Sequence, residues 1–157
     1  MAKSQSPATS TSAAPIEGKR KGGATLFSTL GGIKVVKELV KEFYERILQD
    51  ENLAHFFVGV NMAHMKRHQV EFLKVAFTQI PDDLDVPEML IEKHMRLFRR
   101  GLNESHFDAV VGHFVDTLNS RNVDAEMVEE AVAIIGPLRS AFAQATQDYG
   151  MGVTVAI

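Results

Sequence analysis

Apolar residues recur at spacings of three and four through most of the chain after Ala24, a pattern typical of amphipathic helices. The clearest example is residues 33–48, where Lys and Glu occupy the opposite face. Its predicted apolar face consists of Ile33, Val36, Leu39, Val40, Phe43, Ile47 and Leu48. Further helices are predicted over about 62–77, from about 86 onward, over 105–120 and over about 125–148. No segment alternates as a strand does, so the sequence predicts an all-α fold.

Helix boundaries are marked by residues with special backbone properties. The pair Gly31-Gly32 permits a tight corner before the first long helix. Asp85 precedes a proline in the first helical turn and is a candidate N-cap, and Asp124 is a second candidate. Pro137 has no backbone N–H, so we expect it to kink the last helix.

Composition divides the chain into one folded domain and two tails. Residues 1–23 are rich in Ser, Thr, Ala, Lys and Gly and carry almost no large apolar side chain, so we expect a flexible N-terminal tail. Residues 24–150 form the predicted domain, and 151–157 a short C-terminal tail. We expect a cytoplasmic protein, although the basic N-terminal tail leaves targeting to an organelle open.

Charge and cysteine content exclude several classes of protein. The chain has 157 residues, a formal net charge of -3 and no cysteine. It therefore has no disulfide, zinc-thiolate site or iron–sulfur cluster. No apolar run approaches the roughly 18–20 residues of a membrane span. We expect the protein to be a monomer. We expect neither nucleic acid nor a membrane as a partner.

Polar residues on two predicted apolar faces are the candidates for chemistry. In residues 62–77 the centre of the buried face is predicted to hold Met65, Gln69, Phe72 and Ala76. His68 falls about 60° to one side, so the pattern predicts that both His68 and Gln69 point inward. In the next helix His94 lies within a stripe that is otherwise apolar.

Two histidines and a glutamine on the inner faces of neighbouring helices predict a shared site. A single inward histidine is most often a hydrogen-bonded core residue, but several together favour a ligand site. Neutral imidazole binds iron, zinc and copper, and the apolar surroundings suit a large cofactor such as haem. The spacing of His64 and His68 also permits zinc chelation, but no third ligand lies close in sequence. A helical interaction module without a cofactor is the remaining alternative.

A series of motifs in a specific order resembles the group I truncated haemoglobins. The chain contains LGG, FYERIL, FF-x-GVNM, KRHQVEFL, a lone helix histidine in MLIEKH, and GLNESHFDAV followed by GPL. The resemblance extends over nearly all of residues 24–148. It implies a two-over-two helical sandwich, in which two antiparallel helix pairs cross around haem b and its iron.

The resemblance also implies the roles of individual residues. His94 matches the proximal iron ligand, and Tyr44 and Gln69 match a polar pair that donates hydrogen bonds to a bound diatomic molecule. His68 lies where relatives carry either a residue that ligates the iron or one that pairs with a haem propionate, and both readings stay open. The positions implied to contact haem are Phe43, Phe57, Met65, Phe72, Leu73, Leu90, Lys93 and Phe98.

By this resemblance the protein reversibly binds O2, NO or CO, with dioxygenation of NO as a further activity that needs an unidentified electron donor. Electron transfer or redox sensing by an iron with two histidine ligands is the alternative. Two features depart from the family. TQIPDDLD replaces the usual Gly-Gly turn before the proximal helix. No histidine follows His113, so we expect haem to be bound without a covalent link.

Overall fold

A computed structural model of the chain describes residues 24–150, which fold into helices and form no β-strand within that range. The two predicted tails lie outside the described residues. The all-α prediction is confirmed. The elements are α1 (Leu26–Leu30), α2 (Gly32–Leu48), α3 (Glu51–Ala54), the short 3-10 helix η4 (His55–Phe57), α4 (Met62–Ala76), α5 (Val86–Arg99), α6 (Glu104–Ser120), α7 (Ala125–Ile135) and α8 (Leu138–Tyr149).

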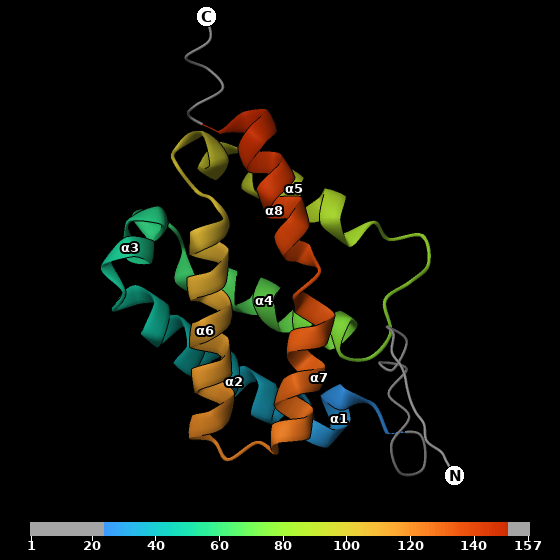
Figure 1. Cartoon of the computed structure of the whole chain (residues 1–157). Helices are drawn as coiled ribbons and strands as arrows, with labels where there is room; N and C mark the ends of the chain where they lie inside the picture. The colour runs from blue at the N-terminus through green and yellow to red at the C-terminus, as the bar shows by residue number, and fades with distance from the viewer. Residues whose placement is uncertain (1–23, 151–157) are drawn as a thin grey trace, which may run out of the picture.

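The long helices form two pairs that cross each other (Figure 1). Helix α2 packs against α4, and α6 packs against α7 and α8. Contacts between α2 and α6 join the two pairs, while α5 lies along α8. This arrangement is the predicted two-over-two sandwich. Helices α4 and α5, which carry candidate site residues, therefore pack against different helices. Helix α4 contacts α2, whereas α5 contacts α8.

Helix ends follow the predicted signals in most places. The Asp85 side chain accepts a hydrogen bond from the Glu88 backbone N–H at 3.0 Å, which confirms the N-cap of α5. Asp124 is at the N-cap of α7 but makes no capping side-chain bond. Pro137 does more than kink the last helix, since α7 ends at Ile135 and α8 begins at Leu138.

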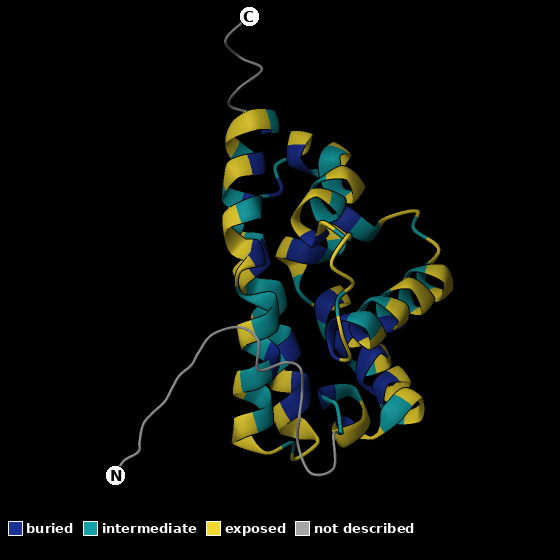
Figure 2. Cartoon of the chain, turned by 90° about the vertical axis from the view of Figure 1, so that its right-hand side faces the viewer, coloured by how far each residue is buried: buried dark blue, intermediate teal, exposed yellow. Residues whose placement is uncertain are grey.

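Two apolar clusters make up the core, and Figure 2 shows their buried residues on the inner sides of the helices. The first is centred on α2 and includes Phe43, Tyr44, Leu73 and Phe114. The second lies around α5 and α8 and includes Phe56, Phe98, Phe107 and Phe142. Phe57, Phe72 and Ile135 are partly buried and pack against both clusters. These three side chains therefore mark where the two halves of the core meet.

The predicted apolar face of α2 is wrong at its two ends. Ile33 is 43% exposed and Leu48 is 41% exposed, whereas Val36, Leu39 and the other members are buried. Both exceptions lie in the terminal turns of the helix. Periodicity assigns a residue to a face, but burial also needs a neighbouring element at that height along the helix.

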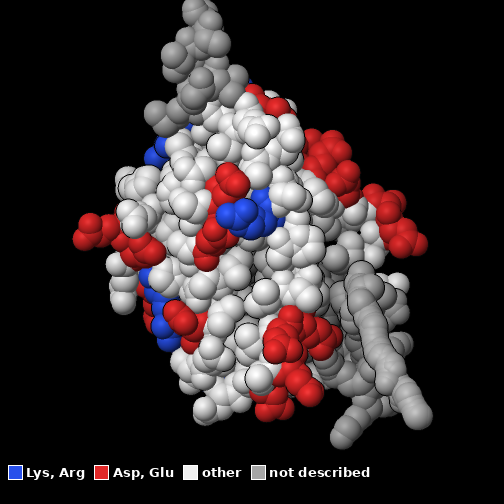
Figure 3. Space-filling model, in the orientation of Figure 1, with Lys and Arg blue, Asp and Glu red and all other residues white. Residues whose placement is uncertain are grey.

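Acidic side chains form several separate areas on the face shown in Figure 3, and basic groups lie beside some of them. One such pairing joins α6 to α8, where Arg139 donates to Asp108 at 2.8 and 2.9 Å. This face offers no broad basic area of the kind that nucleic-acid phosphates require. No helix within residues 24–150 is long and apolar enough to cross a membrane.

Gly31 forms the corner between α1 and α2, and its conformation yields a stability prediction. Its φ is +128°, and a Cβ there would lie 2.4 Å from Val35 Cγ2. We expect Gly31→Ala to lower the free energy of unfolding by about 1–3 kcal/mol, because both the backbone and the neighbour must shift. Urea unfolding measures this. Gly112→Ala is the matched control, because its Cβ meets nothing within 4 Å; a similar loss there would contradict the explanation.

Candidate functional site

His94 lies on α5, and its orientation is fixed by one short hydrogen bond. Nδ1 is 2.7 Å from the backbone carbonyl oxygen of Leu90, one turn earlier. A carbonyl oxygen only accepts, so Nδ1 carries the proton and donates. In the neutral ring Nε2 then has a free lone pair, which is the form in which histidine ligates a metal.

The surroundings of His94 favour the neutral ring. Burial lowers the pKa of His94, and the hydrogen bond to Leu90 opposes this only in part. The imidazole therefore stays uncharged at neutral pH. Its ring centroid lies 5.9 Å from that of Phe142 on α8. The result is a neutral ring with a fixed orientation beside the aromatic side chain of Phe142.

Tyr44 and Gln69 form a polar pair between α2 and α4. The Tyr44 hydroxyl donates to Gln69 Oε1 at 3.3 Å. Burial raises the pKa of Tyr44, so the phenol keeps its proton. Gln69 Nε2 makes no hydrogen bond within residues 24–150 and has both N–H groups available. The pair thus offers donors in surroundings that are otherwise mainly apolar.

Aromatic side chains connect this pair to the rest of the site. The Tyr44 ring is 5.0 Å from Phe43 and 5.9 Å from Phe57, measured between centroids. Met65 and Phe72 are partly buried against the first apolar cluster. In the second cluster Phe98 is buried and Leu90 is half-buried. Most of the predicted contact residues are therefore gathered from both sides of the junction between the two clusters.

Two of the predicted contact residues differ from the others in exposure. Leu73 is only 2% exposed and lies inside the first cluster, where α4 meets α2. Lys93 is exposed at the surface of α5. Their positions give Leu73 a packing role and leave the Lys93 side chain in contact with solvent.

The predicted inward position of His68 is wrong, since its side chain is exposed. Helix α4 buries Val70, Leu73 and Ala76, a stripe about 70° from the predicted centre that shares only Ala76 with it. Met65, Gln69 and Phe72 consequently form a second, half-buried face. His68 lies beyond that face, with its ring centroid 4.1 Å from that of His64.

Some features were not predicted. Phe142 beside His94 was missed, although its spacing from Leu138 and Ala145 is a helical signal. His106 accepts a hydrogen bond from the Asn103 backbone N–H at 3.0 Å and so helps to begin α6. His113 binds Asp50, with 2.8 Å between Nε2 and Oδ2. Each of these contacts joins particular side chains or backbone groups, and the helical period of the sequence does not show which groups meet.

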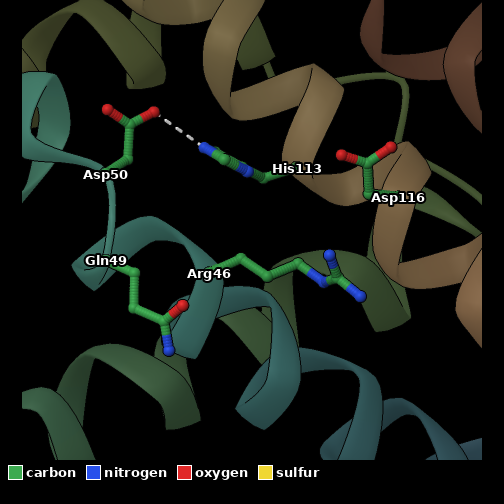
Figure 4. A pocket seen from close by; sticks show the side chains of 5 residues that line it. All are labelled: Arg46, Gln49, Asp50, His113 and Asp116. Carbon is green, nitrogen blue, oxygen red and sulfur yellow. Dashed lines mark hydrogen bonds and ion pairs between the residues drawn. The ribbon is translucent and has the colours of Figure 1, made fainter.

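A surface pocket lies at the contact between Asp50 and His113, away from the residues described above (Figure 4). It is lined by Arg46, Gln49, Asp50, His113 and Asp116. Charges of both signs and an internal hydrogen bond occupy its walls. None of the predicted site residues is among these five. The pocket lies where the C-terminal end of α2 and the residues after it meet α6.

Comparison with known proteins agrees with this geometry. Residues 25–144 match the bacterial-like globin family. The group 1 truncated hemoglobin GlbN of Synechocystis sp. is 40% identical over 114 residues, covering 72% of this chain and 90% of that protein. The GlbN of Mycolicibacterium paratuberculosis is 34% identical over 115 residues, covering 73% and 81%.

Solved structures show the same helix arrangement. Chlamydomonas reinhardtii THB4 is similar with a TM-score of 0.69 and 34% identity, covering 81% of this chain and 99% of that one. The 2/2 hemoglobin from Synechococcus sp. PCC 7002 has a TM-score of 0.68 and 31% identity, covering 77% and 99%. The fold is that of a 2/2 globin. The chain belongs to the bacterial-like globin family and, within it, to the group 1 truncated haemoglobins.

The bond between Asp50 and His113 yields a pH prediction. It is the main cause that lowers the pKa of Asp50, so the carboxylate stabilises the fold above its ordinary pKa of 3.8 and loses this effect as pH falls. Asp50→Asn keeps an N-cap for α3 but removes the charge. We expect it to cost about 1 kcal/mol at pH 6, with the difference shrinking toward pH 3. Unfolding by urea across this range measures it; a pH-independent difference would contradict the assignment.

Proposed function

We propose that this chain holds haem b without a covalent link, with His94 as the proximal ligand of the iron, and reversibly binds O2, NO or CO. The observation that carries the proposal is the hydrogen bond from His94 Nδ1 to the backbone carbonyl oxygen of Leu90. This bond leaves Nε2 with a free lone pair. The name of the Synechococcus structure states that its heme is covalently attached. This chain has no histidine after His113 to make such a link from its last helix.

The residues fit a large flat apolar group. Phe57 and Phe72 pack against both apolar clusters, so they lie where a ring inserted between the clusters would contact them. The half-buried face of α4 adds Met65 and Gln69. Leu90 and Phe98 supply apolar surface on the His94 side. Aromatic and aliphatic surface with few polar groups is typical of a haem site.

Tyr44 and Gln69 favour gas binding over electron transfer. Haem supplies an iron with a coordination position that accepts a diatomic molecule. Gln69 Nε2 can donate to a polar ligand, and Tyr44 holds the amide in this orientation through Oε1. These donors stabilise a polar ligand such as O2 more than CO. Electron transfer does not require such a pair of hydrogen-bonding side chains. The presence of the pair therefore favours gas binding over electron transfer.

Dioxygenation of NO is the reaction that we assign to the same pocket. Its overall balance is NO + O2 + e⁻ → NO3⁻, so it requires a separate one-electron donor. The residues of the pocket supply hydrogen-bond donors but no group that could provide an electron at every turnover, and the chain has no cysteine. The electron donor is therefore a distinct partner.

We assign His68 as a reversible internal ligand of the iron. It precedes Gln69 on α4 and is exposed, and its ring makes no hydrogen bond within residues 24–150. A side chain with these properties can turn toward the neighbouring half-buried face. When it does so, an external ligand binds only to the fraction of molecules in which His68 has moved away.

His94→Ala tests the proximal ligand. We expect haem affinity to fall by about 100-fold or more, equivalent to about 3 kcal/mol, because no other described residue presents an oriented imidazole there. Soret absorbance on titration with haem measures this. Added imidazole is expected to restore the spectrum in part, and His55→Ala is the control. A normal ferrous spectrum in His94→Ala would rule out His94 as the ligand.

His68→Leu tests the internal ligand. We expect ferric wild-type protein to give a low-spin, six-coordinate visible spectrum, and His68→Leu to give a high-spin one. His64→Leu removes the neighbouring imidazole and is expected to stay low-spin. A high-spin wild-type spectrum that His68→Leu leaves unchanged would show that His68 does not bind the iron.

A further inference from the structure

His64 and His68 form a pair of exposed imidazoles on α4. They are four residues apart, so they lie on one side of the helix, and their ring centroids are 4.1 Å apart with 47° between the ring planes. Neither ring makes a hydrogen bond within residues 24–150. Both side chains therefore have nitrogen lone pairs available to a cation.

The distance between the rings favours a particular coordination geometry. With metal–nitrogen bonds of about 2.0 Å, a metal lies about 3.2 Å from each ring centroid. Two imidazoles at a right angle around one ion then have centroids about 4.5 Å apart, and a tetrahedral angle gives about 5.2 Å. The observed 4.1 Å is shorter than both values and is nearer to that of the right-angled arrangement. That geometry is typical of tetragonal Cu²⁺ and Ni²⁺ rather than tetrahedral Zn²⁺.

Neighbouring charges leave the pair open to a cation. Glu71 lies seven residues after His64 on the same stripe of α4 and is exposed. Arg67 flanks the stripe and offsets that charge. Within residues 24–150 no group of three His, Cys, Asp or Glu side chains is placed to hold a metal ion. Water would complete the coordination, as tetragonal ions allow.

We propose that His64 and His68 form a bidentate surface site for a first-row transition-metal dication, with Cu²⁺ preferred by the usual affinity order. A second consequence rests on the proposed function. A His68 ring turned toward the haem iron no longer lies beside the His64 ring, so an ion held by both rings withdraws His68 from the iron. The site then frees the sixth position for an external ligand.

The site itself is tested on the full-length chain without haem, using Cu²⁺ in a non-coordinating buffer. Titration calorimetry measures affinity, and electron paramagnetic resonance counts the coordinating nitrogens. We expect two imidazole nitrogens in the wild type, and a loss of about 100-fold in affinity in either His64→Gln or His68→Gln, because chelation is lost. His55→Gln removes a different exposed histidine and is expected to bind as the wild type does. Equal affinity in His64→Gln and the wild type overturns the site.

Its coupling to iron is tested on the ferric haem protein. Cu²⁺ is expected to convert a low-spin spectrum to high-spin over the concentration range in which the haem-free chain binds it. His64→Gln is expected to stay low-spin and to lose this response. A low-spin spectrum that saturating Cu²⁺ leaves unchanged overturns the coupling. Failure of His68 as an iron ligand is recognised separately, by a high-spin wild-type spectrum before any copper is added.

Discussion

The bond from His94 Nδ1 to the Leu90 carbonyl is the interaction on which the rest of the site depends. It fixes the proton on one nitrogen, orients the ring and leaves the lone pair of Nε2 free. It joins two residues of one helix, so it forms wherever α5 forms and the ring adopts this rotamer. The N-cap at Asp85 begins that helix, and the contact with α8 holds it in place. Contacts within α5 thus orient the ring independently of the opposite wall of the site.

The opposite wall depends on how the helix pairs cross. Helix α4 divides its residues between a face buried on α2 and a half-buried face that carries Met65, Gln69 and Phe72. Tyr44 reaches Gln69 from α2 and fixes the orientation of its amide. A donor pair of this kind is costly to bury unless its groups find partners. Its place beside the junction of the two apolar clusters explains why a polar ligand would be held there.

Two imidazoles on α4 give the molecule a second set of ligand atoms outside the core. His68 is close enough in sequence to Gln69 to serve the pocket and close enough in space to His64 to share a surface ion. These two uses exclude each other, because each needs the same side chain. Both proposed uses of His68 therefore depend on its exposed position on α4.

The sequence by itself determined the helices, the Gly31 corner, the Asp85 cap and the place of His94 on an apolar stripe, because each depends on neighbours within about one helical turn. Its motif order also identified the truncated-globin arrangement, which the family match confirmed. Only the tertiary structure decided that His68 is exposed, that Phe142 lies beside His94 and that Asp50 binds His113. Periodicity gives the width of an apolar arc, whereas the part of that arc that becomes buried depends on which distant helix covers it.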